Sequence, residues 1–383
     1  MTNARQSAAL VTGGAGFIGS NLAHRLLLEG GRVVILDNLS RPGVESNLNA
    51  LAREFPDRLT FEERDIARAG LLKKLVLEVS RVYHFAAQVA VTTSLEDPLL
   101  DFETNVRGTV NLLEACRSAH QPPSFMYTST NKVYGSLEDI PMRRSGNRYE
   151  PAEAAYRTGV SEVRPLDFHT PYGCSKGAAD QYVLDYARSY RMPAAVFRMS
   201  CIYGPRQCGT EDQGWVAHFV LRALAEEPIT IYGDGMQVRD ILYIDDLLDA
   251  FGLLAANLPR LAGQAFNIGG GTNNTVSLLE VIGWIAELTG AKPKLEFAPW
   301  RQGDQKYYVS DTRKFEKAAG WAPRFAVREG VAHLHRWLSE NHNAILTAQS
   351  KLDFRREHLF WLPRTASSLG VRVFEAAAGT RRA

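Results

Sequence analysis

The sequence has few cysteines, almost no net charge and no long apolar run, and each scarcity excludes a class of protein. Four cysteines in 383 residues are too few for a disulfide framework, and none has the spacing of a metal site, so we expect no bound metal. A formal net charge of +2 is too small to predict binding to nucleic acid or to a membrane surface. No run of about 18 apolar residues is present, and the N-terminus leads into a strand without a secretory signal. These absences favour a cytoplasmic globular protein.

Up to residue 203, short apolar strands alternate with amphipathic helices. This alternation predicts the α/β class, with a doubly wound parallel sheet covered by helices on both faces. The looser pattern that follows predicts a smaller α/β lobe. We expect strands at 8–12, 32–37, 81–87, 124–129, 194–198 and 265–269, and helices at 102–119, 245–256, 277–289 and 327–341.

The same pattern divides the chain into three parts. Residues 1–203 form the strand–helix domain, and residues 239–270 are expected to return to it. Residues 204–238 and 271–343 form the smaller lobe. Residues 344–383 have weak periodicity and are interpreted as a tail of unknown role.

A glycine-rich turn after the first strand indicates a dinucleotide site. Gly13, Gly16 and Gly19 join this strand to a helix, and their backbones allow a pyrophosphate to approach the positive end of that helix. Asp37 ends the second strand, where a carboxylate accepts from ribose hydroxyls and repels a 2′-phosphate, which favours NAD over NADP. Ordinary turn chemistry is the alternative for the glycines, and the nearby Arg41 is a weak argument for a phosphate.

Tyr172 and Lys176 are four residues apart and therefore fall on one face of a helix. A lysine ammonium beside a tyrosine stabilises the phenolate and lowers its pKa from about 10, so Tyr172 is a candidate general base. Most such pairs lie on ordinary amphipathic helices. The interpretation here depends on the dinucleotide turn in the same chain.

Several further motifs accompany this pair and carry a resemblance. Together they resemble the extended short-chain dehydrogenase/reductases that modify nucleotide sugars, over roughly residues 7–340, and within them the CDP-paratose (CDP-tyvelose) 2-epimerases. The motifs are the glycine turn, Asp37, Asp65, His84-Phe85-Ala86-Ala87, Asn105-Val106-Arg107-Gly108-Thr109, Ser129–Gly135, Asp167–Asp180, Asp212–Val216, Arg239-Asp240 and Arg301-x-Gly303-Asp304.

The resemblance implies a Rossmann domain for NAD and a reacting group of three residues. Tyr172 would be the acid/base, Lys176 would bind the nicotinamide ribose, and Thr130 would hydrogen-bond the reacting sugar oxygen. Asp65 would flank the adenine, with a helix N-cap as the alternative role. The implied cofactor-binding residues are Gly13, Gly16, Phe17, Ile18, Gly19, Asp37, Asn38, Asp65, Ile66, Ala86, Ala87, Asn105, Ser129, Tyr172 and Lys176.

The residues after Thr130 separate reaction types within this superfamily. Sugar 4,6-dehydratases carry an Asp-Glu pair there, whereas this chain has Asn131-Lys132, so we expect no dehydration. An epimerase needs one base, one hydride acceptor and room for a flat ketone to present both faces. The expected reaction moves hydride from a sugar carbon to NAD⁺ while Tyr172 takes the hydroxyl proton, and then returns hydride to the other face. Reaction at C2 is implied by the resemblance alone.

The expected substrate is a nucleotide-diphosphate sugar. Arg206, Arg239 and Arg301 suit a diphosphate, because one guanidinium group can donate two parallel hydrogen bonds to phosphate oxygens. The segment Thr92-Thr93-Ser94 has no cation, which suits an uncharged deoxysugar. The complete set of candidate substrate contacts is Thr93, Thr130, Asn131, Lys132, His169, Arg206, Gln207, Trp215, Arg239 and Arg301.

Two alternative functions remain open at this stage. One is a UDP-sugar 4-epimerase or UDP-uronate decarboxylase, and the other is a non-catalytic NAD-binding regulatory protein. The resemblance also implies a homodimer that pairs the helices at 102–119 and around Tyr172. Leu112, Leu113, Val183 and Tyr186 would serve either that interface or the core.

Overall fold

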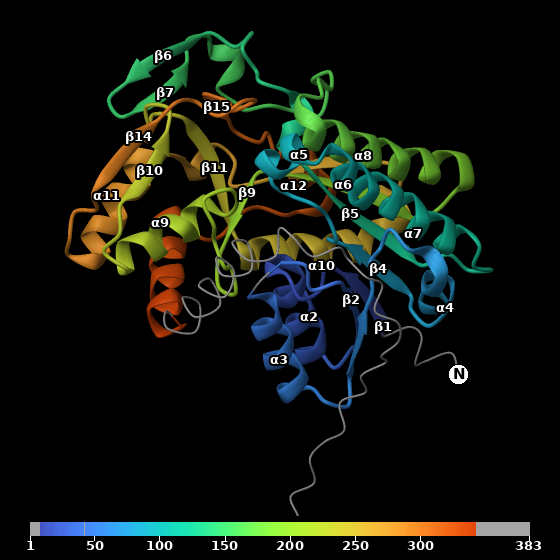
Figure 1. Ribbon diagram of the computed structural model, residues 1–383. Coiled ribbons are helices and arrows are strands. Elements are labelled where there is room, and N and C mark those ends of the chain that lie inside the picture. The colour runs from blue at the N-terminus through green and yellow to red at the C-terminus, as the bar shows by residue number, and fades with distance from the viewer. Residues whose placement is uncertain (1–7, 42, 342–383) are drawn as a thin grey trace, which may run out of the picture.

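A seven-stranded parallel sheet forms the centre of the molecule (Figure 1). The computed structural model describes residues 8–41 and 43–341, and the tail expected at 344–383 lies outside them. The strand order β12-β8-β5-β4-β1-β2-β3 extends from β1 in both directions, which confirms the doubly wound class. The strands are β1 (Ala8–Thr12), β2 (Arg32–Asp37), β3 (Leu59–Glu63), β4 (Arg81–His84), β5 (Ser124–Thr130), β8 (Ala194–Met199) and β12 (Ala265–Ile268).

The six predicted strands are all present, with one shortened. The strand expected at 81–87 ends at His84, because its neighbour β1 ends at Thr12, opposite that residue. Phe85 N still donates to Thr12 O at 3.0 Å. The chain then leaves the sheet at its carboxyl edge, where ligands bind in this class of fold.

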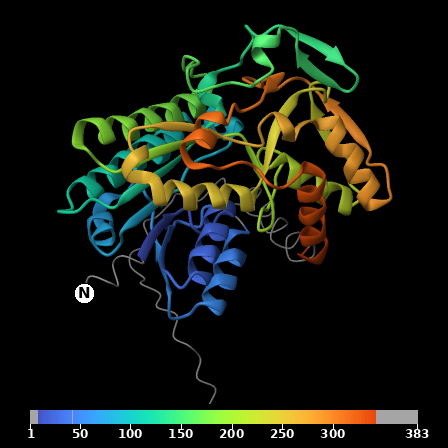
Figure 2. The same ribbon diagram turned by 180° about the vertical axis from the view of Figure 1, so that it is seen from behind.

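Helices cover both faces of the sheet, and Figure 2 shows the same layers from behind. Val11 on β1 packs on the face of α2, α3 and α10, and its neighbour Leu10 packs on the face of α4, α7 and α8. Successive strand residues point to opposite faces, so a sheet covered on both sides needs continuous apolar strands. These helices are α2 (Phe17–Leu28), α3 (Val44–Glu54), α4 (Leu72–Leu77), α7 (Gly108–Arg117), α8 (Thr170–Tyr190) and α10 (Ile244–Leu261).

The helix predicted at 102–119 is interrupted by a wider, π-helical turn. Helix α6 (Pro98–Phe102) is followed by the turn η2 (Glu103–Arg107) and then by α7. A Cβ at Gly108 would lie 2.6 Å from Ile66 Cγ2, so only glycine permits this approach after the turn. Such turns occur often at functional sites, and this one carries the buried Asn105.

Outside the main sheet, the described strands form three smaller sheets, and β6, β7 and β9 come before residue 204, where the smaller lobe was expected to begin. β11 pairs with β9, β13 and β15, β10 pairs with β14, and β6 pairs with β7. The strands of these sheets are β6 (Met142–Ser145), β7 (Arg148–Pro151), β9 (Cys201–Tyr203), β10 (Ile229–Tyr232), β11 (Val238–Tyr243), β13 (Thr275–Ser277), β14 (Leu295–Ala298) and β15 (Tyr307–Tyr308). The remaining helices of the described chain are α5 (Val91–Glu96), α9 (Trp215–Leu224), α11 (Leu278–Thr289), α12 (Arg313–Ala319) and a helix over residues 327–341. Its short turns are η1 (Ala69–Leu71), η3 (Asn131–Tyr134), η4 (Ala154–Tyr156) and η5 (Thr272–Asn274).

The chain returns from the lobe to the main sheet through α10 and β12. β12 pairs in parallel with β8, and α10 packs against α2. β11, at the start of the returning segment, belongs instead to the small sheet. Helix α10 ends at Leu261, later than the expected Ala256, and contains Pro259 in its last turns.

The described residues contain neither a membrane-spanning helix nor a cluster of metal ligands. None of their helices is both long and apolar enough to cross a membrane. In the same ranges, no three histidine, cysteine, aspartate or glutamate side chains gather as a metal site would require.

Candidate active site

The glycine turn forms a tight cradle at the carboxyl edge of β1. Gly13 has φ +68°, and a Cβ there would lie 2.7 Å from Ala86 N. A Cβ at Gly19 would collide with Gly13 O. Side chains are therefore excluded where the backbone would meet a pyrophosphate at the N-terminus of α2. The cradle fits the dinucleotide predicted from Gly13, Gly16 and Gly19, and Phe17 and Ile18 begin the helix beneath it.

Asp37 connects this cradle to the end of β2. Its Oδ2 accepts from Ala15 N at 3.0 Å, and its Oδ1 accepts from Leu39 N at 2.9 Å. Burial raises the pKa of Asp37, while these backbone donors lower it. Each oxygen keeps a free lone pair, so the carboxylate can also accept from ribose hydroxyls. Its position agrees with the predicted role.

The predicted adenine-side residues meet beside Asp37. Asn38 Nδ2 lies 3.5 Å from Asp65 Oδ2, and Asp65 Oδ1 accepts from Ala67 N at 2.9 Å. Asp65 thus closes a local turn and does not cap a helix, since the next helical turn, η1, begins only at Ala69. Its Oδ2 still faces Asn38. Ile66 is buried against Gly108, so only its backbone remains for a ligand.

The three proposed reacting residues converge where β5 meets α8. Tyr172 lies in the first turn of α8, and its N–H donates to Ser94 Oγ at 3.1 Å. Burial raises the pKa of Tyr172 to about 12, opposed by a hydrogen bond with Thr130 and by the charge of Arg41. Lys176 Nζ donates to Thr128 O at 2.6 Å and lies 4.3 Å from the centre of the Tyr127 ring.

The expectation that Lys176 lowers the pKa of Tyr172 is wrong for this structure. The helix places both residues on one face, as predicted, but the ammonium points to the carbonyl of Thr128. Burial also lowers the pKa of Lys176 to about 7, although Asp101 and Asp180 raise it. Desolvation therefore outweighs the charge effect expected from spacing.

The remaining predicted cofactor residues surround this centre. Asn105 bonds only to protein groups here, since it donates to Gln88 O and Ser175 Oγ at 3.0 Å each and accepts from Gln88 N at 2.8 Å. Ala86 N points at Thr12 Oγ1, 3.3 Å away, and Ala87 follows at the half-buried strand exit. Ser129 Oγ is buried without a partner among the described residues, which leaves it available to a ligand.

A cavity of about 320 Å³ lies between this centre and the smaller lobe. Five residues that the sequence predicted as substrate contacts line it: Asn131, Lys132, Trp215, Arg239 and Arg301. Arg239 and Arg301 come from different segments, β11 and the loop after β14. Two of the three guanidinium groups predicted to bind a diphosphate are thus brought to one cavity.

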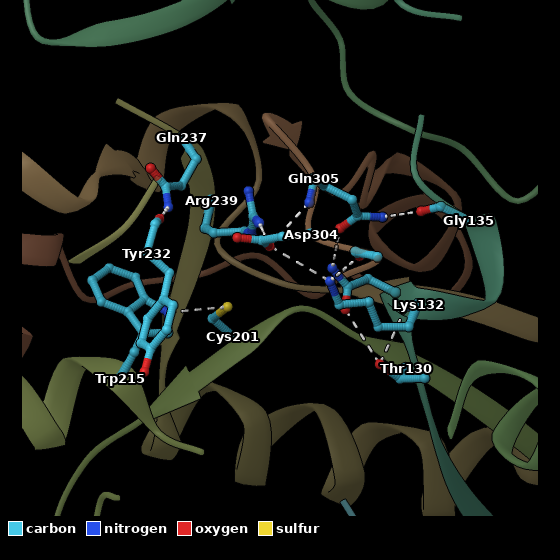
Figure 3. A network of polar contacts seen from close by, with 12 residues as sticks. Thr130, Lys132, Gly135, Cys201, Trp215, Tyr232, Gln237, Arg239, Asp304 and Gln305 are labelled. Atoms are coloured by element: carbon cyan, nitrogen blue, oxygen red, sulfur yellow. Dashed lines mark hydrogen bonds and ion pairs between the residues drawn. The ribbon is translucent and has the colours of Figure 1, made fainter. Parts of the chain in front are cut away.

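Polar contacts connect the floor of the cavity to the loop at 301–305 (Figure 3). Lys132 Nζ donates to Gly303 O at 2.9 Å and lies 3.7 Å from Asp304 Oδ1. Arg239 Nη2 donates to the same Asp304 oxygen at 2.6 Å. Gln305 Nε2 donates to Gly135 O at 2.6 Å. Lys132 is therefore held by the protein, and burial lowers its pKa.

Five predicted substrate contacts do not line the cavity, and one of them is Thr130, which directly precedes the cavity residue Asn131. Thr93 lies on α5, a helix where a loop was expected, and Thr92 lines the cavity in its place. His169, the residue before α8, pairs with Asp167 at 3.0 Å, and both side chains are exposed. The other two are Arg206 and Gln207.

Arg206 and Gln207 lie behind or beside the cavity wall. Arg206 O accepts from Asn47 Nδ2 at 3.2 Å, and Glu54 acts on its guanidinium, so it lies by α3. Gln207 donates to Ile202 O at 3.2 Å and packs behind Gly214, which itself lines the cavity. The sequence of a loop does not indicate the direction in which each of its side chains points.

Several cavity residues were missed from the sequence. Arg301 lies 3.8 Å from the centre of the Tyr232 ring. Trp215 Nε1 donates to Cys201 Sγ at 3.4 Å, and Gln237 Nε2 donates to Tyr232 O at 2.8 Å. Asp304 had a signal in the motif Arg301-x-Gly303-Asp304, whereas the missed Tyr232 and Cys201 are ordinary strand residues and the missed Gln237 lies in the loop before β11.

Comparisons with known proteins agree with this geometry. The family model described as GDP-mannose 4,6 dehydratase matches residues 10–334. The chain belongs to this family. It is 41% identical over 337 residues to a CDP-paratose 2-epimerase from Salmonella typhi, covering 86% of the chain and 98% of that protein. It is 36% identical over 326 residues to a UDP-glucose 4-epimerase from Mycolicibacterium smegmatis, covering 84% and 96%.

A solved structure supports the same assignment. A dTDP-glucose 4,6-dehydratase from Streptomyces venezuelae, crystallised with NAD, matches with a TM-score of 0.76 and 31% identity over 88% of the chain and 98% of its own. The relatives are nucleotide-sugar epimerases and dehydratases. The predicted membership of this group of enzymes, and the predicted fold, are therefore confirmed.

Proposed function

We propose that the protein epimerises a nucleotide-diphosphate hexose with NAD, and that it converts CDP-paratose to CDP-tyvelose by inversion at C2. The observation that carries the proposal is the pair Asn131-Lys132 on the floor of the cavity. Neither side chain is a carboxyl group, and Asn131 Nδ2 donates to Gln305 Oε1 at 3.2 Å. The resemblance implies that a dehydratase uses a carboxyl pair here to protonate the leaving hydroxyl, whereas Lys132 Nζ is bound to Gly303 O and lies beside Asp304. The similarity to the 2-epimerase over 98% of its length supports the finer assignment.

The residues that would hold NAD fit it in shape and chemistry. The cradle of Gly13 and Gly19 leaves no room for side chains, Asp37 offers acceptors to a ribose, and Ser129 Oγ has no partner among the described residues. When bound, NAD would supply the hydride acceptor and donor for a reaction without net redox change.

The chain's own residues manage the proton. Tyr172 takes the proton of the sugar hydroxyl and later gives it back, and Thr130 hydrogen-bonds the same sugar oxygen. Burial raises the pKa of Tyr172 to about 12, which keeps its hydroxyl protonated near neutral pH, and a cation bound beside it, such as the nicotinamide of NAD⁺, would lower that pKa towards the range of a base. Arg239 and Arg301 hold the diphosphate, so that the hexose can turn while the nucleotide stays bound.

A UDP-sugar 4-epimerase is the second candidate, supported by the 36% identity to such an enzyme. The two are distinguished by incubating the purified protein separately with CDP-paratose and UDP-glucose. Proton NMR then identifies the inverted carbon. Inversion at C2 of CDP-paratose is expected, and turnover of UDP-glucose alone would contradict the proposal. A protein that turns over neither sugar, but binds NAD, would fit the regulatory alternative.

We also propose a cytoplasmic homodimer. The four cysteines are unpaired, as in a reducing compartment. Leu112, Leu113, Val183 and Tyr186 are buried in the core of the single chain, so they do not supply the interface. Exposed apolar side chains on α5, α6 and α8 can do so instead, namely Leu95, Leu99, Leu100, Phe102, Tyr182 and Tyr190.

A further inference from the structure

Asp101 is a buried carboxylate that the mechanism above does not use. It lies on α6 with an exposed fraction of 0%. Its Oδ1 accepts from Gln88 Nε2 at 2.9 Å and from Asn105 Nδ2 at 3.3 Å. Its Oδ2 has no hydrogen-bond partner among the described residues. A carboxylate buried with neutral donors alone is costly, so a nearby cation is expected to balance it.

The nearby cation is Lys176, whose own contacts are also neutral. Its ammonium meets the carbonyl of Thr128 and the ring of Tyr127. Asp101 and Asp180 are the two carboxylates that act on it.

Asp180 is already committed to another cation. Its two oxygens accept from Arg198 Nε and Nη2 at 2.9 Å each, and both side chains are buried. Because the charge of Arg198 balances that of Asp180, Asp180 contributes little to stabilising the ammonium of Lys176. Asp101 has no such partner and is therefore the carboxylate whose charge remains for Lys176.

Hydrogen bonds fix Asp101 relative to the lysine. Asn105 Nδ2 contacts both Asp101 Oδ1 and Ser175 Oγ, at 3.3 and 3.0 Å. Ser175 directly precedes Lys176 on α8. The π-helical turn that carries Asn105 thus connects α6 to the catalytic helix.

The buried rings of His84 and Tyr127 beside this pair carry no charge near neutral pH. Burial lowers the pKa of His84 to about 3 and raises that of Tyr127 well above 10. Arg41 acts on Tyr172 from the loop after β2. On the packed elements, the ion pairs Arg107–Glu103, Arg117–Glu114 and Arg188–Asp185 lie at the surface. Apart from the Asp180–Arg198 pair, Asp101 and Lys176 are the buried charged groups on these elements.

We propose that Asp101 is the counter-ion that keeps the Lys176 side chain in its ammonium form, which makes it a positioning residue of the active site. Its negative charge opposes the desolvation of the lysine. The same charge raises the pKa of Tyr172. The effect on catalysis rests on the proposed function, whereas the effect on Lys176 does not.

The variant Asp101→Asn tests this with little change of shape. Its amide oxygen can keep the bonds from Gln88 and Asn105, and its NH₂ takes the place of the unpartnered Oδ2. In the NAD-free protein, ¹³C-lysine NMR should show Lys176 titrating lower than in the wild type, by on the order of one pH unit. The matched control is Glu96→Gln, which removes the same charge from the exposed end of α5.

The expected effect on turnover follows from the sign of this shift. A lysine with a lower pKa loses its charge at lower pH, so the alkaline limb of the kcat/KM profile should move towards acid in Asp101→Asn and stay in place in Glu96→Gln. An unchanged Lys176 titration, or a loss of activity that is equal at every pH, would overturn the proposal. If the wild type turns over no nucleotide sugar, the proposed function fails while the NMR titration still decides the role of Asp101.

Discussion

Asn131 Nδ2 donates to Gln305 Oε1 at 3.2 Å, between residues that are 174 positions apart in the chain. Asn131 also accepts from Thr130 Oγ1 at 3.2 Å, and Gln305 follows Asp304, which binds Arg239. Asn131, the neighbour of the proposed reacting residue Thr130, is therefore connected to Arg239, which is proposed to bind the diphosphate. At the position where the resemblance implies an acid in sugar 4,6-dehydratases, this chain has a residue that joins the two sides of the cavity.

Gln305→Leu should break this connection and destabilise the fold. It leaves Asn131 Nδ2 and Gly135 O buried without partners, at a cost of about 1–3 kcal/mol. Urea unfolding measures the loss in free energy. The exposed neighbour gives the control, since Gln302→Leu should change stability by less than about 0.5 kcal/mol. Equal stabilities of the two variants would contradict the role given to Gln305.

Tyr172→Phe should abolish epimerisation and leave the fold intact. The ring stays packed, but the hydroxyl that moves the proton is gone, so kcat should fall by about 10²–10⁴-fold. Turnover is measured by NMR, and circular dichroism checks the fold. Tyr182→Phe, an exposed tyrosine on the same helix, should retain full activity. Activity that survives Tyr172→Phe would rule out the proton role.

Arg301→Ala should raise KM much more than Arg206→Ala. Arg301 lines the cavity and stacks on Tyr232, whereas Arg206 lies by α3, outside it. Loss of a charged contact to phosphate costs about 1.5–3 kcal/mol, so KM should rise about tenfold or more in Arg301→Ala. Steady-state kinetics should show a near-normal KM for Arg206→Ala. A larger effect at Arg206 would restore the assignment made from the sequence.

Much of this site could be predicted because its parts are local. The glycine turn, Asp37 at a strand end and the Tyr172–Lys176 spacing each occupy a single element, so a short motif describes them completely. The chemistry that depends on surroundings could not be predicted. The spacing of Tyr172 and Lys176 was correct, yet burial, which the sequence does not display, raises the pKa of Tyr172 against the expected direction and lowers that of Lys176.

Side-chain direction in loops was the other limit. Arg206, Gln207 and Arg301 all come from irregular segments, and only Arg301 turns into the cavity. The interruption of the helix at 102–119 was missed as well, because a π-helical turn keeps the same apolar residues. That turn places Asn105 and Asp101 beside the catalytic helix, so the missed feature is part of the site.

Leu99→Glu should separate the proposed dimer. Leu99 is 76% exposed on α6, and a charge within an apolar interface would remain unpaired. Light scattering after gel filtration should give a dimer for the wild type and a monomer of about 42.5 kDa for the variant. Leu28→Glu places the same charge on α2, at a residue that is 62% exposed, and should leave the dimer intact. A monomeric wild type would contradict the interface.

His84 should make the protein less stable in acid. Its Nδ1 lies 2.6 Å from Thr12 Oγ1 and its Nε2 lies 2.9 Å from Thr109 Oγ1, and burial lowers its pKa from 6.5 to about 3. Between these two values the unfolded chain binds a proton that the folded protein does not, so stability falls as the pH decreases, by up to about 1.4 kcal/mol per pH unit.

Comparing the pH dependence of stability in the wild type and in His84→Gln assigns the loss of stability in acid to His84. Other groups also titrate in acid, so the informative quantity is the difference in slope between the wild type and His84→Gln, which keeps a donor and an acceptor but cannot titrate. Urea midpoints at pH 5 and pH 7 should differ more for the wild type than for the variant. His24→Gln, at the surface beside Glu54, should keep the steeper slope. Equal slopes in the wild type and His84→Gln would show that the buried ring does not resist protonation.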